Sequence, residues 1–217
     1  KNMFSKIFPK IHVEGYKFLV ISGIITIVFY IFSDFLALLG LLLTIWVYYF
    51  FRDPERITID DDNYLVSPAD GEVIKVEEVD GPKELNLENK RFRKISIFMN
   101  VFDCHLNRTP CAGNIEEILY KPGKFLNASF DKASEDNERN YYKIKDNQNN
   151  DIILVQIAGL VARRIVCETS KDQELKQGER VGMIRFGSRA DIYYENYEPL
   201  VKVGQRAISG ETLLAKK

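Results

Sequence analysis

Gly187 and Ser188 stand together inside a stretch that otherwise reads as two β-strands. Apolar residues precede the pair in Val181–Phe186 and follow it in Ala190–Glu195, a pattern that predicts a strand, a break and a second strand. Glycine before serine in such a pattern is typical of a bulge or tight turn. Glycine also permits the strained backbone in which a serine hydroxyl attacks its own preceding carbonyl. Such an N-to-O acyl shift, followed by β-elimination, would leave a pyruvoyl group, so the pair is a candidate self-cleavage site.

Two further residues are of types that could assist this chemistry. His105 lies where an apolar strand gives way to a polar loop, and it is the one histidine of the segment 64–217. Because imidazole titrates near neutral pH, His105 could act as a base. A lone histidine is more often a structural residue. Asp70 precedes Gly71 in a common turn dipeptide, although an aspartate can also orient an imidazole and stabilise its charged form. Both interpretations stay open for each residue.

Composition narrows the class of protein. The 217 residues carry 30 basic and 31 acidic side chains, so the net charge of −1 does not indicate a nucleic-acid partner. Three cysteines form no CxxC pair, which favours a reducing compartment over a disulfide framework. With His105 as the nearest histidine to Cys104 and Cys111, no metal site is expected.

The N-terminal region predicts a membrane anchor. A basic segment, residues 1–17, precedes two apolar runs, Phe18–Phe32 and Phe35–Phe51, which only Ser33 and Asp34 separate. At ~1.5 Å per residue each run is roughly 22–26 Å long as a helix, slightly short of a ~30 Å hydrocarbon core. We therefore expect a helical hairpin over 18–51 that spans twice or dips into one leaflet.

Flanking charges predict the orientation of this anchor. Lys10 and Lys17 precede the hairpin, and Arg52 and Arg56 follow it. By the positive-inside rule both ends lie in the cytoplasm, which predicts a cell-membrane protein whose remaining domain is on the cytoplasmic face.

After a polar linker at 52–63, the segment 64–217 predicts a compact, mainly antiparallel β domain. Short runs rich in Val, Ile, Phe and Tyr alternate with turn residues. The strands expected are Glu72–Val79, Arg91–Met99, Ile115–Lys121, Asp151–Ala158, Leu160–Glu168, Val181–Phe186, Ala190–Glu195 and a final stretch around Leu200–Leu214. Ser67–Val73 and Val203–Leu213 resemble the strand-turn-strand edges of lipoyl- and biotin-carrier barrel sandwiches. The charged stretch Ser129–Asn140 is expected to be a solvated loop.

Five ordered motifs make the chain recognisable as a whole. They are Ser67–Gly71, Asn100–Pro110, Lys132–Asn140, Ala162–Ile165 and Arg185–Arg189. In this order the motifs resemble the short bacterial and archaeal phosphatidylserine decarboxylases, and the resemblance covers essentially the whole chain. It implies a proenzyme that cuts itself into a β chain, 1–187, and an α chain, 188–217.

The resemblance also implies the cofactor and the reaction. Ser188 would become a covalent pyruvoyl group at the start of the α chain, with no metal. Its carbonyl would condense with the amine of phosphatidylserine to an imine that takes up the charge left by loss of CO₂, and protonation would give phosphatidylethanolamine. The partners implied are the membrane lipid and the two chains of one proenzyme, and a homo-oligomer stays open.

Site residues follow from the matching positions. Asp70 and Ser188 match the aspartate and serine of the family's charge relay. The longer family form has two histidines in the matching segment. In this chain His105 occupies the first of these positions and Arg108 the second. His105 is then the base for cleavage, the proton donor after decarboxylation, or both. Candidates for binding the lipid phosphate or the serine carboxylate are Arg108, Arg163, Arg164 and Arg189, with an exposed ion pair as the alternative for each.

Three alternatives remain. One is archaetidylserine as the substrate of the same mechanism. Another is a non-enzymatic, membrane-anchored carrier or adaptor module with a lipoyl-like barrel. The third is a pyruvoyl decarboxylase of a soluble substrate, which the apolar N-terminal segment disfavours.

Overall fold

The computed structural model describes residues 9–126, 136–160 and 164–217, and its contacts divide the chain into two compact units. The first unit ends at Glu55 and the second begins at Arg56. This boundary falls inside the predicted linker at 52–63.

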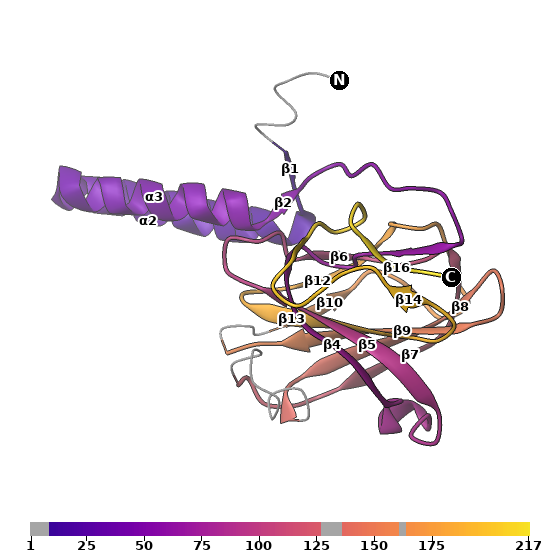
Figure 1. The fold of residues 1–217 in the computed structure, drawn as a ribbon. Helices are drawn as coiled ribbons and strands as arrows, with labels where there is room; N and C mark the ends of the chain where they lie inside the picture. The colour runs from indigo at the N-terminus through magenta and orange to yellow at the C-terminus, as the bar shows by residue number, and fades with distance from the viewer. Residues whose placement is uncertain (1–8, 127–135, 161–163) are drawn as a thin grey trace. The chain divides into compact units, whose positions relative to one another are not determined.

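The first unit contains the predicted helical hairpin (Figure 1). Its elements are β1 (Lys10–Ile11), the 3₁₀ helix η1 (Val13–Gly15), α2 (Tyr16–Phe32), α3 (Asp34–Phe50) and β2 (Arg52–Asp53). Ser33 is extended and separates the helices, and its hydroxyl accepts a hydrogen bond from the Phe35 amide as the N-cap of α3. Antiparallel pairing of β1 with β2 joins the two ends of the hairpin.

Small residues let α2 and α3 pack closely. A Cβ added to Gly40 would lie 2.9 Å from the Thr26 Cα, so the helices meet here at near-backbone distance. Beside it the hydroxyls of Thr26 and Thr44 share a 3.0 Å hydrogen bond. Close approach at glycine with hydroxyl contacts is the usual packing of helices in lipid, where apolar side chains alone give no reason to associate.

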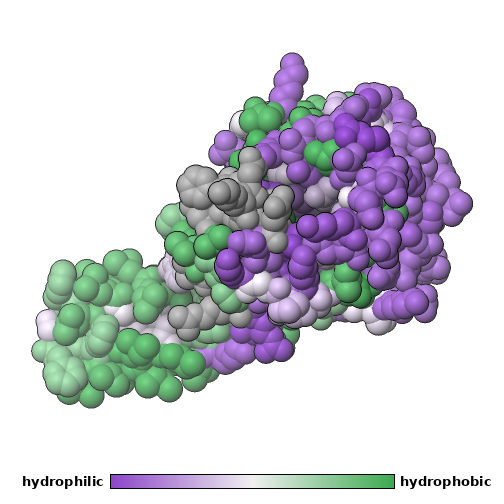
Figure 2. Space-filling view, turned by 90° about the horizontal axis from the view of Figure 1, so that it is seen from below, coloured by the Kyte–Doolittle hydropathy of each residue, from purple (hydrophilic) through white to green (hydrophobic). Residues whose placement is uncertain are grey.

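The outer surface of the hairpin is apolar, as Figure 2 shows for the two helices. Ile31 and Phe32 are each 75% exposed. The helical segment Val13–Phe32 is long and apolar enough to cross a membrane, and Asp34–Phe50 is shorter. The hairpin could therefore anchor the chain in a membrane.

The second unit is a β domain, as predicted. Its elements are β3 (Tyr64–Val66), β4 (Gly71–Asp80), the 3₁₀ helix η2 (Lys83–Leu85), β5 (Arg91–Met99), β6 (Leu106–Arg108), β7 (Gly113–Lys121), β8 (Arg139–Asp146), β9 (Asp151–Ala158), β10 (Ile165–Cys167), β11 (Glu174–Leu175), β12 (Arg180–Ile184), β13 (Ser188–Tyr194), β14 (Glu198–Pro199), β15 (Arg206–Ala207) and β16 (Leu213–Lys216).

One large antiparallel sheet dominates this unit. Its strand order is β11-β7-β8-β9-β13-β5-β4-β15, and two three-stranded sheets, β10-β12-β6 and β14-β16-β3, complete the fold. β13 is an interior strand of the large sheet, paired with β5 on one side and β9 on the other. The residues at which β13 begins are therefore held from both sides.

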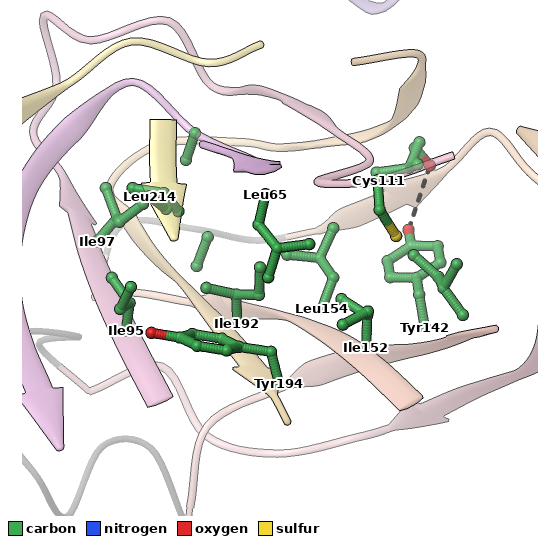
Figure 3. Close-up of a cluster of buried hydrophobic side chains, with 14 of the residues drawn as sticks. Leu65, Ile95, Ile97, Cys111, Tyr142, Ile152, Leu154, Ile192, Tyr194 and Leu214 are labelled. Carbon is green, nitrogen blue, oxygen red and sulfur yellow. Dashed lines mark hydrogen bonds between the residues drawn. The ribbon is translucent and has the colours of Figure 1, made fainter. Parts of the chain in front are cut away.

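The core follows from alternation along the central strands. Ile152 and Leu154 of β9 pack with Ile192 and Tyr194 of β13 in the larger cluster (Figure 3). The intervening residues of β9, such as Val155, belong to a second cluster on the other face. β9 is buried along its whole length, so both faces of this strand are covered. Each fully buried aliphatic side chain contributes about 1.5–3 kcal/mol.

The prediction of a solvated loop at Ser129–Asn140 is wrong for residues 137–140, within the part of this segment that the structure describes. Asn137 is fully buried and Arg139 begins β8. The Asn137 side chain hydrogen-bonds the backbone of Leu126 and Ala158, and Arg139 forms an ion pair with Glu84. These partners make burial of the polar side chains tolerable.

The two turn segments that look alike in sequence lie against each other. β15 pairs with β4 at Arg206–Glu72 and Ala207–Gly71, and the Ser67 carbonyl accepts a hydrogen bond from the Gly210 amide at 2.7 Å. The sequence likeness to lipoyl-carrier edges remains a prediction. The contact brings residues near 206–210 to the turn that carries Asp70.

Candidate active site

Ser188 is the first residue of β13 and is fully buried. In register it lies opposite Met99, the last residue of β5, and opposite Ala158, the last residue of β9. Its hydroxyl lies 3.7 Å from the sulfur of Met99 as a hydrogen-bond donor. A thioether is a weak acceptor, so the hydroxyl is positioned by the sheet but held only loosely.

The backbone before Ser188 is strained, as the Gly-Ser break suggested. Phe186 has φ +63° and Gly187 has φ +67°, two consecutive residues in the left-handed region. A side chain at Gly187 would meet no atom within 4 Å, so the backbone conformation, and not lack of space, favours glycine there. A left-handed Phe186 costs about 1–2 kcal/mol relative to the ordinary region. Strain of this kind is concentrated at functional sites.

His105 lies at this strained turn. Its ring is fully buried, and Nε2 accepts a 3.2 Å hydrogen bond from the Gly187 amide. Nδ1 lies 3.0 Å from the Asp103 carbonyl, to which it donates. These two partners assign a neutral imidazole that carries its proton on Nδ1 and has its lone pair on Nε2, at the Gly187 amide that precedes the Gly187–Ser188 bond.

Backbone pairing fixes the position of His105. It directly precedes β6, whose partner β12 leads into the Phe186–Gly187 turn. The His105 carbonyl accepts a 3.2 Å hydrogen bond from the Ile184 amide. The sheet therefore brings two segments together that are 82 residues apart in sequence.

Asp70 is held by a cation and a backbone amide. Arg56 donates from Nη2 to both carboxylate oxygens, at 2.9 and 2.7 Å, and the Ser209 amide donates to Oδ1 at 2.8 Å. The side chains of Arg56 and Asp70 are 15% and 11% exposed. The predicted pairing of Asp70 with the imidazole of His105 remains a prediction.

A chain of buried polar side chains leads from the Met99 sulfur into the core. Asn107 Nδ2 lies 3.7 Å from that sulfur, Gln156 Nε2 donates to Asn107 Oδ1 at 2.9 Å, and the Tyr142 hydroxyl donates to Gln156 Oε1 at 2.7 Å. Burial raises the pKa of Tyr142 well above its usual value, so the phenol stays protonated. Sequence reasoning missed these residues, although Gln156 in an otherwise apolar strand was a signal.

The candidate substrate-binding arginines lie in different surroundings. Arg108 is mostly buried and donates to the Gly178 carbonyl at 2.9 Å. Arg164 is exposed. Arg189 is 1% exposed and binds both oxygens of Asp191, at 2.7 and 2.6 Å, so its ion pair is buried and not exposed as the alternative supposed. Arg163 lies outside the described residues.

The site combines a strained turn at Phe186 and Gly187, a neutral imidazole on the Gly187 amide, and a buried serine at a strand start. Within the described ranges no group of three or more His, Cys, Asp or Glu side chains is arranged to hold a metal ion. Such a site is suited to acyl transfer within the chain, because nucleophile, base and carbonyl belong to adjoining segments.

Comparison with known proteins places the chain in a family. The family model for phosphatidylserine decarboxylase matches residues 43–215. A phosphatidylserine decarboxylase proenzyme of Pelagibacter ubique is 76% identical over 215 residues, covering 99% of this chain and 100% of that protein. Proenzymes of the same name from Ruegeria pomeroyi and Cereibacter sphaeroides are 52% and 50% identical, covering 94% and 99% of this chain and 94% and 93% of their own lengths. The motifs, the site and these matches agree, and the chain belongs to the phosphatidylserine decarboxylase family.

Proposed function

We propose that this chain is a proenzyme that cleaves its own Gly187–Ser188 bond and then decarboxylates phosphatidylserine through a pyruvoyl group derived from Ser188. The observation that carries the proposal is the 3.2 Å hydrogen bond between the Gly187 amide and His105 Nε2, at two consecutive left-handed residues. Decarboxylation itself is the activity of the family to which the chain belongs.

In this proposal His105 is the base for cleavage. The Ser188 hydroxyl exchanges its weak contact with the Met99 sulfur for Nε2, which removes its proton. The oxygen bonds to the Gly187 carbonyl carbon, and the Ser188 nitrogen takes up a proton as its bond to that carbon breaks. Elimination then removes the Cα proton and breaks the Cβ–O bond, which frees the Gly187 carboxylate and leaves a Cα–Cβ double bond. A proton then adds at Cβ, and the Cα–N bond becomes an imine. Water replaces the nitrogen at Cα and releases ammonia, which leaves the pyruvoyl group.

The residues around Ser188 fit such a group because its atoms are those of Ser188 itself. The position is fully buried at the start of an interior strand, and the Met99 sulfur lies between the Ser188 hydroxyl and the Asn107 side chain as a contact of both. The carbonyl of the group supplies an electron sink for the charge that loss of CO₂ leaves on the substrate. His105 remains beside it as the proton donor for the product.

The N-terminal hairpin supports a membrane lipid as substrate. A diacyl lipid stays in its bilayer, so an anchor on the same chain keeps the enzyme on the surface that holds the substrate. Basic residues flank both ends of the hairpin, which supports a catalytic domain on the cytoplasmic face. The family assignment favours this enzyme over the carrier-module alternative.

The test compares the wild type with Ser188→Ala by intact mass and by CO₂ release from phosphatidylserine in mixed micelles. We expect fragments of 187 and 30 residues from the wild type, the smaller without a free N-terminal amine, and one uncut, inactive 25.1 kDa chain from the variant. Ser96→Ala is the matched control, since Ser96 is equally buried in β5. A wild-type chain that stays whole yet releases CO₂ would exclude the pyruvoyl mechanism.

A further inference from the structure

The segment that follows β14 contacts two aspartates, Asp70 and Asp103. Ser209 donates its amide to Asp70, and Arg206 binds Asp103. Arg206 is on β15, which pairs with β4 at the edge of the large sheet. Residues on the C-terminal side of the proposed cut therefore hold acidic residues on its N-terminal side.

The contact between Arg206 and Asp103 is two-pronged. Nη2 of Arg206 donates to Oδ1 at 2.5 Å, and Nη1 lies 3.4 Å from Oδ2. The Asp103 side chain is 5% exposed, whereas that of Arg206 is 58% exposed. The pKa of Arg206 is raised, mainly by this hydrogen bond to Asp103. A planar guanidinium fork fits a carboxylate in a way that an ammonium group does not.

The Asp103 carboxylate in turn closes the loop after β5. Its Oδ2 accepts a 2.9 Å hydrogen bond from the Asn100 amide, and the Asp103 amide donates to the Asn100 carbonyl at 3.0 Å. The side chain and the backbone of Asp103 are thus fixed together. Rotation of this residue would move its carbonyl.

That carbonyl is the acceptor for Nδ1 of His105, at 3.0 Å. The bond sets the ring orientation and keeps the lone pair on Nε2, the atom that meets Gly187. A continuous series of contacts therefore leads from Arg206 through Asp103 to the imidazole.

We propose that Arg206 is a positioning residue for self-cleavage, which acts through Asp103 to hold His105 at the Gly187–Ser188 bond. The inference rests on the proposed function and deepens it. Arg206 touches none of the reacting atoms, so its effect is on geometry. After cleavage the same ion pair joins the fragment 188–217 to the fragment 1–187.

The test measures the rate of chain cleavage in newly synthesised full-length protein, followed on denaturing gels. Arg206→Ala should slow cleavage about tenfold to a hundredfold, the range expected for a misplaced catalytic group. Arg206→Lys should restore only part of the rate. Millimolar methylguanidinium should accelerate Arg206→Ala, since the site is open to solvent, and should not affect the wild type. Lys202→Ala is the matched control on the same segment and should cleave at the wild-type rate.

The outcomes separate the two proposals. A wild-type chain that never cleaves overturns the proposed function and this inference with it. If the wild type cleaves and Arg206→Ala cleaves at the same rate, the inference about Arg206 is overturned and the proposed function stands. Slow cleavage together with a lowered melting temperature of the uncut chain, and without rescue by methylguanidinium, would show a merely structural ion pair and also overturns it.

Discussion

The amide of Gly187 donates a hydrogen bond to Nε2 of His105 across 3.2 Å, although 82 residues separate them. The bond places a neutral imidazole on the residue whose carbonyl precedes Ser188. It also shows which ring nitrogen carries the lone pair, because Nδ1 is engaged by the Asp103 carbonyl. The arrangement joins the proposed base and the strained turn directly before the serine.

His105→Ala should slow self-cleavage by about 10²- to 10⁴-fold, the usual contribution of a general base. The main-chain hydrogen bond from Ile184 to residue 105 does not involve the side chain, so β6 and β12 should still pair. Cleavage of newly made protein is followed on denaturing gels, with circular dichroism as the check on folding. His12→Ala, at the other histidine, is the control and should cleave normally. Equal rates for His105→Ala and the wild type would refute the assigned base.

Alanine should be tolerated at Gly187 far better than at Gly182. The added methyl group at Gly187 meets no atom within 4 Å, so the cost is the left-handed φ of +67°, about 1 kcal/mol. At Gly182 the methyl group would lie 2.1 Å from the Val166 carbonyl oxygen, which should cost about 3 kcal/mol through forced displacement of β10. Urea unfolding in detergent, with Ser188→Ala present in both variants to keep the chain whole, gives the two values. A larger loss at Gly187 than at Gly182 would contradict the open space around Gly187.

Arg164 and Arg189 should respond differently to replacement by methionine. Arg164 is exposed, so if it binds the lipid headgroup its loss should raise KM several-fold with little effect on the unfolding midpoint. Arg189→Met leaves the buried Asp191 carboxylate without its cation, which should destabilise the fold by about 3–5 kcal/mol. Kinetics in phosphatidylserine micelles and unfolding curves are measured on both. An unchanged KM for Arg164→Met would remove it from the candidates.

Asp146 should make stability depend on acid pH. Burial would raise its pKa, but hydrogen bonds from Asn150, Tyr197 and Gln148 outweigh burial and hold the pKa below its ordinary value. Because the folded pKa is the lower one, this stabilisation is present above the unfolded pKa of about 3.9 and is lost as pH falls through the folded value.

Asp146→Asn should therefore lower the free energy of unfolding by about 1–3 kcal/mol at pH 7, with a smaller difference below pH 4. Asp80→Asn is the control, since Asp80 forms an exposed pair with Arg91 and should change stability by less than about 1 kcal/mol. Urea unfolding of the uncut chain across pH 3–7 measures both. A difference that does not vary with pH would contradict the depressed pKa.

Local patterns predicted the elements with simple periodicity. β5 and β9 have the predicted bounds, and the two apolar runs are α2 and α3 as expected. β8 was missed because its sequence mixes charged residues with tyrosines, and only the partners of Asn137 and Arg139 in the fold allow their burial. In this strand tertiary contacts outweigh local polarity.

The candidate site was predictable in its types of residue but not in its contacts. Ser188 and His105 stand out because a strained glycine-serine pair and a lone base have few other uses together. Met99 meets Ser188 only through the register of β13 with β5, and Asn107 meets the Met99 sulfur only through the return of the chain in β6. No local pattern encodes either contact. The contact of Arg206 with Asp103 spans 103 residues and likewise depends on strand order.

The interior position of β13 has a consequence for the order of the folding reaction. The uncut chain folds in a first-order process, because every strand is tethered to its neighbours. In the proposed product β13 belongs to a separate 30-residue peptide whose strand is still paired with β5 and β9 at seven positions each. Once unfolded, the processed protein can refold only by a second-order encounter of two peptides, at a rate that falls on dilution. Self-cleavage would therefore make recovery of the folded state depend on protein concentration, whereas refolding of the uncut chain does not.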